Sequence, residues 1–492
     1  MKFLQKTVPI IFILMFSYII VLLVFFSSMK YVGKETFMLP NIIIIPIFVL
    51  VLFGLVKLPK KKDITRKKYY KYIIIISIVI YLIQLLIQLY GAFKTGWDAG
   101  YVNFLSDCFI ENNNKLCETA YLTRYPNNIM ITFILIVLKK ITYPILGKRL
   151  ILVLAVNALL VNLSGVFASL VVDNITKNRR LALSTYYLSI PLILLSPWIF
   201  VAYTDTFAII FPILIVYLYT KKDRNKLDFF LIVFLSIFGY FIKATVAIVL
   251  IAIFIIEIFN FNKAKLKKIG YKQLAIYSML FVFGIITPFL IKNCALRIMH
   301  FEKDNSVPEF TLVHYLALGQ NNETNGAFSG DDMYYSLNNG MGNNYNRFKE
   351  RLFGRTPKEQ VVFFSKKTLL NFNNGAFAYG REGSFYSEVR ITSDKKVIFV
   401  RNLFYKQGKY YKYILQIQQY LWLLVILFIP FIVKKKNTKE ELLLMTAIIG
   451  ITLFLAIFEA RSRYLYCYAP LFVASAVMGI SNLKKRLIKT ID

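Results

Sequence analysis

Long runs of apolar residues, separated by short polar segments, occupy most of this 492-residue chain. The run Tyr72–Tyr90 contains no charged residue, and about 18 apolar residues in succession are typical of a membrane-spanning helix. The pattern predicts an all-α polytopic membrane protein of about twelve spans. They are expected near residues 8–28, 39–56, 72–91, 150–172, 181–198, 205–220, 228–242, 244–259, 273–293, 413–433, 441–458 and 464–480.

The cations between these runs predict how the chain is oriented. The net charge is +34, and half of the 60 Lys and Arg residues lie in seven short segments. Because lysine and arginine concentrate in cytoplasmic loops, placing these segments inside predicts a multi-pass protein of the cell membrane with both termini cytoplasmic. The segments are 1–7, 57–71, 173–180, 221–227, 260–272, 434–440 and 481–492. This distribution indicates contacts with membrane lipids and not with nucleic acid, for which no module is present.

This orientation leaves two large regions outside, within three expected domains. Residues 1–293 form a membrane bundle whose loop 92–149 is external, 294–411 form an external segment, and 412–492 return to the membrane. The apolar stretch 127–146 is interrupted by Lys139-Lys140 and Pro144, which favours an interfacial or re-entrant helical hairpin on the outer face.

Smaller features of the external regions are also open to prediction. The Asn- and Gly-rich stretch 319–346 is expected to be loop, whereas 357–370 is compatible with a helix. Cys108 and Cys117 share the first external loop, where both a disulfide and free thiols are consistent with the sequence.

Two acids at the outer ends of predicted spans are candidate catalytic residues. Asp98 follows the third span within Gly96-Trp97-Asp98-Ala99-Gly100, and a carboxylate at a membrane face is costly unless it is used. Alternatively, Asp98 is a solvated acid in a loop and has no catalytic role. Asp205 lies at the next outer hairpin, where it either assists in acid–base chemistry or caps a helix.

Several outward-facing side chains are candidates for binding an anionic substrate group. Arginine binds phosphate through two parallel hydrogen bonds, and a lysine at a hairpin tip can meet a phosphate or extend to the interface. Arg461 and Arg463 face outward, so the positive-inside rule does not explain them. An ion pair with Glu459 would be a structural explanation. A lone loop histidine is more often structural. The candidates are Arg124, Tyr125, Lys243, His314, Arg461 and Arg463.

These motifs together resemble the GT-C glycosyltransferases, polytopic enzymes that include the protein O-mannosyltransferases and the aminoarabinose transferases of lipid A (family 39). Trp97-Asp98-Ala99-Gly100 resembles the acidic motif of their first external loop. Arg124-Tyr125-Pro126 resembles the proline-containing juxtamembrane helix, and Tyr203-Thr204-Asp205 the second external aspartate. The segment around Lys243 resembles the part of the family in which a lysine lies near the outer tip of a later hairpin. The segments around His314 and Glu459-Ala460-Arg461 are similar to Gram-positive membrane proteins near this family.

The resemblance implies an inverting transfer of a sugar from a polyprenyl-phosphate donor to an acceptor hydroxyl on the extracytoplasmic face. Asp98 would be the general base, and Lys243, Arg461 and Arg124 would stabilise the departing phosphate. The acceptor would be a glycan, a glycolipid or a protein, and no metal or other cofactor is implied. The chain departs from the family in placing the aspartate after the third span, and in having Ala99 where an acidic neighbour is common.

Two other functions also fit a basic multi-span protein. A polysaccharide polymerase or ligase acts on lipid-phosphate sugars at the same membrane face. A non-enzymatic flippase for lipid-linked glycans would carry ionisable residues at mid-membrane depth and two related halves, and neither feature is visible in the sequence.

Overall fold

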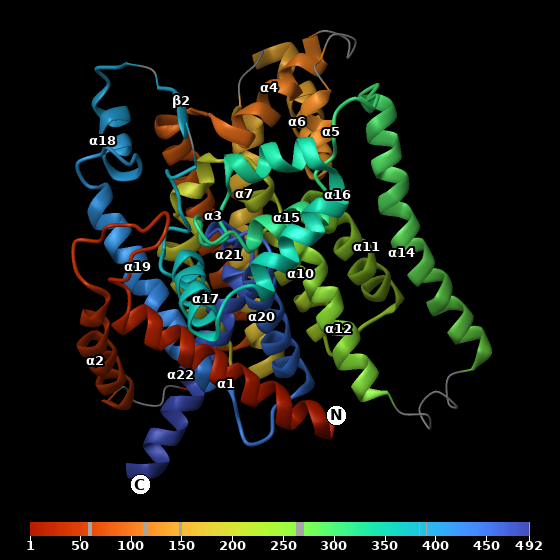
Figure 1. Ribbon diagram of the computed structural model, residues 1–492. Coiled ribbons are helices and arrows are strands. Elements are labelled where there is room, and N and C mark those ends of the chain that lie inside the picture. The colour runs from red at the N-terminus through yellow and green to blue at the C-terminus, as the bar shows by residue number, and fades with distance from the viewer. Residues whose placement is uncertain are drawn as a thin grey trace.

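The computed structural model describes residues 1–57, 62–111, 117, 119–146, 150–261, 270–382, 384–389 and 391–491. These residues form a helical bundle with both termini at one end (Figure 1). The helices preceding the first external region are α1 (Lys2–Phe25), α2 (Ile44–Lys57) and α3 (Arg66–Gly91), and those within it are α4 (Trp97–Glu111), α5 (Ala120–Arg124) and α6 (Ile129–Leu146).

The central part of the chain continues as helices of very different lengths. Several of these helices, given next in chain order, are linked by short 3-10 or π turns. They are α7 (Ile151–Thr176), α8 (Arg179–Ser189), α9 (Thr204–Phe207), α10 (Ile210–Thr220), α11 (Lys226–Ile242), α12 (Ala247–Asn260), α14 (Tyr271–Ile298), α15 (Leu312–Gly319), α16 (Gly330–Phe353), α17 (Pro357–Phe372), α18 (Lys395–Phe404), α19 (Tyr411–Phe428), α20 (Lys439–Ile457), α21 (Arg463–Tyr466) and α22 (Ala469–Ile491).

Six helices of the described residues are long and apolar enough to cross a membrane: α1, α3, α7, α14, α19 with the turn that follows it, and α20. Each of the twelve predicted spans overlaps helical structure, but several are shorter or broken. The expected span 181–198 divides into α8, a π-helical turn (η3, Ile190–Leu194) and a 3-10 turn (η4, Pro197–Phe200). Pro191 and Pro197 explain this division, because proline lacks the amide that an α-helix interior requires.

The packed centre of the molecule lies around the first half of α22, which contacts α7, α8 and α19. Residues from Tyr466 to Phe472 in this region are all buried. In contrast, α14 packs mainly on α11 and exposes large apolar side chains, among them Phe283 and Leu290. Exposed apolar side chains on a helix that packs mainly on one neighbour are typical of a lipid-facing surface.

Two predictions about the external regions are wrong. The stretch 127–146 is one continuous helix after a 3-10 turn (η2, Pro126–Asn128) and not a hairpin. Its Lys139 is buried and donates to Asp107 at 2.7 Å and to Ser106. This ion pair accommodates Lys139 within the packed helix, while Lys140 is exposed, so neither lysine requires the helix to break.

The second prediction, a loop at 319–346, is wrong for residues 330–346, which belong to α16, whereas residues 320–329 form turns without helix. Asp332 in the first turn pairs with Arg351 at 2.8 Å and with Arg347 at 3.0 Å, both on the same helix. A kink at Gly340 (φ 71°) divides α16 into two helical parts, and these ion pairs join the first part to the second. Contacts between the two parts outweigh the low helix propensity of the asparagines and glycines. The helix expected at 357–370 is confirmed by α17.

A short antiparallel sheet joins the two external regions. Strand β1 (Lys94–Thr95) pairs with β2 (Tyr386–Glu388), with Lys94 opposite Glu388 and Thr95 opposite Tyr386. Cys108 and Cys117 are joined by a disulfide, which ties the end of α4 to the segment before α5. The sheet therefore brings residues near 96 and residues near 384 to the same place.

Candidate functional site

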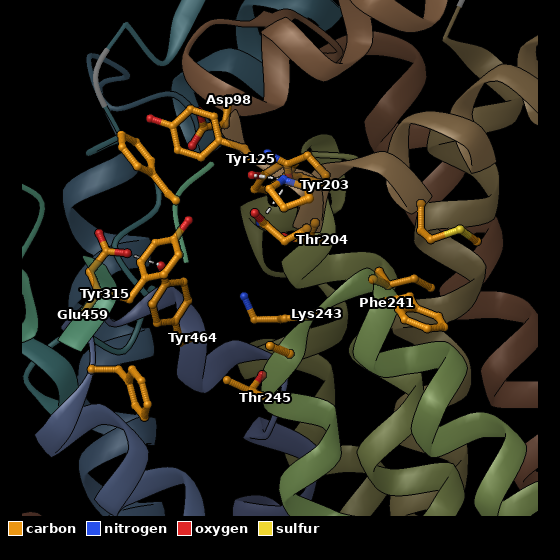
Figure 2. A pocket seen from close by; sticks show the side chains of 18 of the residues that line it. Asp98, Tyr125, Tyr203, Thr204, Phe241, Lys243, Thr245, Tyr315, Glu459 and Tyr464 are labelled. Atoms are coloured by element: carbon orange, nitrogen blue, oxygen red, sulfur yellow. Dashed lines mark hydrogen bonds between the residues drawn. The ribbon is translucent and has the colours of Figure 1, made fainter. Parts of the chain in front are cut away.

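A cavity of about 1090 Å³ opens in the bundle, and α4 and α5, which lie at the end opposite the termini, form part of its wall. In Figure 2, Asp98, Tyr125 and Tyr203 lie at one end, and Lys243 and Thr245 lie farther down. Tyr315, Tyr464 and Glu459 form the facing wall. The lining also includes apolar residues of the membrane helices, namely Phe241, Phe289, Phe454 and Phe458. The cavity thus combines a charged end with an apolar flank, which suits an amphipathic ligand.

The backbone around Asp98 is held in a tight conformation. A Cβ atom at Gly96 would lie 1.8 Å from the Ser384 carbonyl oxygen, and one at Gly100 would lie 2.0 Å from the Thr95 carbonyl oxygen. Only glycine fits such close backbone approaches. Trp97 between them has a φ of 46°, a left-handed conformation that costs about 1–2 kcal/mol in a non-glycine residue. Strain of this kind is common where a side chain must be aimed precisely.

A chain of hydrogen bonds orients the Asp98 carboxylate in the cavity. The Tyr121 hydroxyl donates to Asp98 Oδ1 at 2.9 Å and accepts from Asn128 Nδ2 at 2.8 Å, while the Tyr203 hydroxyl donates to Asn128 Oδ1 at 3.0 Å. Burial raises the pKa of the Asp98 carboxyl, and Arg463 and the Tyr121 hydroxyl offset this only in part. A carboxylate with a raised pKa is a stronger base than an exposed aspartate.

Asp205 does not line the cavity, contrary to the prediction of a second catalytic carboxylate there. It is fully buried behind the wall, where its Oδ1 accepts from Lys243 Nζ at 2.6 Å and its Oδ2 lies 3.9 Å from Arg463 Nε. Asp205 is thus a partner of two cavity cations, and Lys243, a predicted binding residue, lines the cavity. A buried carboxylate between two cations fixes their positions because none of the three charges is stable there alone.

Arg461 is held by two carboxylates. Its Nε donates to Glu459 Oε1 at 2.9 Å, and its Nη1 donates to Glu382 Oε2. Burial opposes ionisation of Glu459, but Arg461, Tyr464 and Arg463 together hold the pKa of its carboxyl below the ordinary value. The internal Glu459–Arg pair considered from the sequence is therefore present, and fewer donors of Arg461 remain for a ligand.

Arg463 lines the same cavity, and its Nε lies 3.8 Å from Glu382 Oε1 and 3.9 Å from Asp205 Oδ2, beyond hydrogen-bond distance. Its guanidinium lies 4.6 Å from the ring centre of Trp97 and 5.5 Å from that of Tyr464. It is 6% exposed, and among the described residues neither Nε nor Nη1 has a hydrogen-bond partner. Buried donors of this kind are costly unless a ligand or water satisfies them. Arg463 is the arginine best placed to accept an anion.

The other predicted binding residues are divided between the wall and its surroundings. Tyr125 and His314 line the cavity, whereas Arg124 does not. His314 Nδ1 lies 2.6 Å from Ser336 Oγ, the ring stacks on Phe310 at 4.1 Å, and burial lowers the pKa of the imidazole. His314 is therefore neutral near pH 7.

Sequence reasoning missed three charged residues of the wall: Glu309, Glu382 and Lys292. Glu309 pairs with Lys303 at 2.7 Å. Glu382 follows a glycine-rich turn far from the other candidates in sequence and carries no motif. Lys292 lies on α14 with its ammonium 5.0 Å from the ring centre of Phe241, and it forms no ion pair with another described residue. A lysine within the apolar run of a predicted span is a signal that was available.

Within the described ranges, no group of three or more His, Cys, Asp or Glu side chains is placed to hold a metal ion. Of the acids that line the cavity, Glu382 and Glu459 contact Arg461, and Asp98 accepts from Tyr121. The cations that line the cavity can bind an organic anion, and its carboxylates can accept a hydrogen bond from a hydroxyl group.

The helical fold, the apolar spans and the cavity among them define a multi-pass integral membrane protein. The chain belongs to the family described as conserved hypothetical integral membrane proteins, whose family model matches residues 1–483. No curated protein and no solved structure matches the chain.

Proposed function

We propose that the protein is a membrane glycosyltransferase of the GT-C type, with about twelve spans and an extracytoplasmic active site. It would move a sugar, with inversion, from a polyprenyl-phosphate donor to an acceptor hydroxyl. The observation that carries the proposal is the cavity in which a hydrogen-bonded Asp98 and the unsatisfied donors of Arg463 occur together. The position of both termini at the opposite end of the bundle is consistent with their predicted cytoplasmic location.

In the proposed reaction the acceptor oxygen attacks the anomeric carbon of the donor as the bond from that carbon to the phosphate oxygen breaks. Asp98 takes the proton of the acceptor hydroxyl, and the phosphate leaves on its lipid. Arg463 and Lys292 neutralise the charge that develops on the leaving phosphate, while Lys243 is held in place by Asp205. The phenylalanines of the apolar flank would contact the polyprenyl chain.

The lining on the acceptor side suits a sugar. Tyr101, Tyr121, Tyr125 and Phe310 form a row with successive ring centres 4.5, 5.0 and 5.2 Å apart. Aromatic faces carry partial negative charge, and the C–H groups of a sugar ring are weakly positive. The row lies beside Asp98, since Tyr121 donates to its carboxylate.

A direct assay tests the reaction class. The purified protein is reconstituted in liposomes with a polyprenyl-phosphate monosaccharide that carries a radiolabelled sugar, and with envelope glycans as acceptors. We expect label to move from the lipid phase into acceptor with release of polyprenyl phosphate. A polymerase or ligase would turn over only an oligosaccharide-lipid donor. Movement of intact labelled lipid between leaflets without cleavage would identify a flippase and contradict the proposal.

Removing the Tyr121 hydroxyl tests the role of Asp98 through pH. The hydroxyl stabilises the ionised carboxylate, so Tyr121→Phe should raise the pKa of Asp98 further. The base works only when ionised, above its pKa. The acidic limb of the pH profile of kcat/KM should therefore shift to higher pH, with activity near wild type on the alkaline side. Tyr413→Phe, on exposed α19 surface, is the control, and an unshifted limb in Tyr121→Phe would exclude Asp98 as the titrating base.

A further inference from the structure

A basic surface surrounds α18, remote from the residues that line the cavity. Between Asp394 and Lys412 the chain carries six cations and one acid. Asp394 caps α18 by accepting from the Lys396 amide. The α18 surface consists of five exposed lysines and two exposed apolar residues of the helix: Lys395, Lys396, Lys406, Lys409, Lys412, Ile398 and Phe399.

This surface lies at the level where two membrane helices end. The Tyr405 hydroxyl donates to the carbonyl of Gly91, the last residue of α3, at 3.1 Å. The ammonium of Lys396 lies 5.7 Å from the ring centre of Tyr90. Six residues after α18, α19 begins at Tyr411 and returns through the bundle. Figure 1 shows α18 above α19, at the end opposite both termini.

The apolar residues of the α18 surface are exposed on the helix that carries two of its lysines, Lys395 and Lys396. Phe399 is 58% exposed and Ile398 is 42% exposed. Beside the ends of two spans, such side chains can enter the interfacial layer of a bilayer while neighbouring lysines reach the headgroups. The ammonium groups of Lys409 and Lys412 lie over the rings of Tyr410 and Tyr413, and tyrosine is typical of this depth.

The charge of the α18 surface is not explained by contacts within the protein or by topology. None of its five lysines forms an ion pair with another residue of the described ranges. With both termini in the cytoplasm, the surface lies on the outer side, where the positive-inside rule predicts few lysines. A cluster of unpaired lysines beside a bilayer attracts anionic lipid headgroups.

We propose that the α18 surface is a binding site for anionic phospholipids, with the lysines contacting headgroup phosphates and Ile398 and Phe399 inserted among the acyl chains. The exposed apolar pair Ile398 and Phe399 favours a lipid over a soluble polyanion. The site would hold the short sheet β1–β2 at the membrane surface, because α18 and β2 belong to one segment. This proposal is independent of the glycosyltransferase reaction.

The test measures lipid selectivity of the full-length protein in bilayers. Electron paramagnetic resonance of spin-labelled lipids gives the relative association constant of phosphatidylglycerol against phosphatidylcholine. We expect the wild-type preference for phosphatidylglycerol to fall at least about threefold in Lys395→Gln/Lys396→Gln, and to weaken at high salt. The matched control Lys349→Gln/Lys358→Gln removes two exposed lysines from α16 and α17 and should keep the preference.

An equal preference in the α18 variant and the wild type would overturn the proposal. Equal losses in both double variants would also overturn it, since the effect would then follow net charge and not this surface. Displacement of spin-labelled phosphatidylglycerol by soluble poly(glycerol phosphate) at equal phosphate would identify an anionic polymer as the ligand instead.

Discussion

Asp98→Asn is expected to lower the rate of sugar transfer at least about 100-fold, the usual contribution of a general base. Asparagine has nearly the same size, and its side-chain oxygen can still accept from Tyr121, whose hydroxyl lies 2.9 Å from the present carboxylate. The protein should therefore keep its thermal stability while it loses the group that takes the acceptor proton. Initial rates with a labelled donor and the melting temperature in detergent separate these two effects.

The matched control for this variant is Asp331→Asn. Asp331 is an exposed acid in the first turn of α16 and does not line the cavity. Its replacement changes the net charge by the same amount and should leave transfer unchanged. Wild-type rates in Asp98→Asn would eliminate Asp98 as the base, whereas equal losses in both variants would point to a general effect of charge.

Asp205→Ala is expected to destabilise the protein by about 3–5 kcal/mol, because it leaves a buried lysine without its carboxylate partner. Lys243 is 8% exposed and its Nζ lies 2.6 Å from Asp205 Oδ1, and Arg463 approaches the other oxygen. The unfolding free energy in mixed micelles and the melting temperature should both fall. Activity should fall with them, since both cations line the cavity.

A second substitution distinguishes the buried ion pair from a loss of packing. Lys243→Met in the Asp205→Ala background removes the unpaired charge and should recover part of the lost stability, as replacement of buried ion pairs by apolar residues often does. Asp223→Ala, in the exposed turn between α10 and α11, should melt as the wild type does. If Asp205→Ala also melts with the wild type, Asp205 has no structural role in this wall.

The arrangement of the site explains why sequence patterns located some of its residues and not others. Asp98, Lys243 and Arg461 were recognisable because each charge interrupts or ends an apolar run, where a charge has few inexpensive reasons to be. Glu382 has no such context, and its pairing with a residue 79 positions away depends on the packing of α21. Asp205 was recognisable in the same way, but its side chain does not line the cavity. It is buried in the protein, where it contacts Lys243 and Arg463.

The same distinction applies to the fold. The continuous helix at 127–146 and the helix α16 were missed because both depend on ion pairs. The Lys139–Asp107 pair joins α6 to α4, and the Asp332–Arg351 pair spans α16. Neither ion pair can be predicted from local propensity. Local propensity predicted a break within 127–146 and a loop where α16 is found.

The sequence by itself determined that this is a helical protein of the membrane, because a backbone in hydrocarbon must satisfy its own hydrogen bonds and long apolar runs can do so only as helices. It also identified Asp98 as an exceptional acid. Only the tertiary structure decided what Asp98 faces. The pairing of β1 with β2, a contact between residues about 290 positions apart, brings the two external regions together over one cavity. Such long-range pairing is selected by the packing of the whole chain and leaves no periodic signal in either segment.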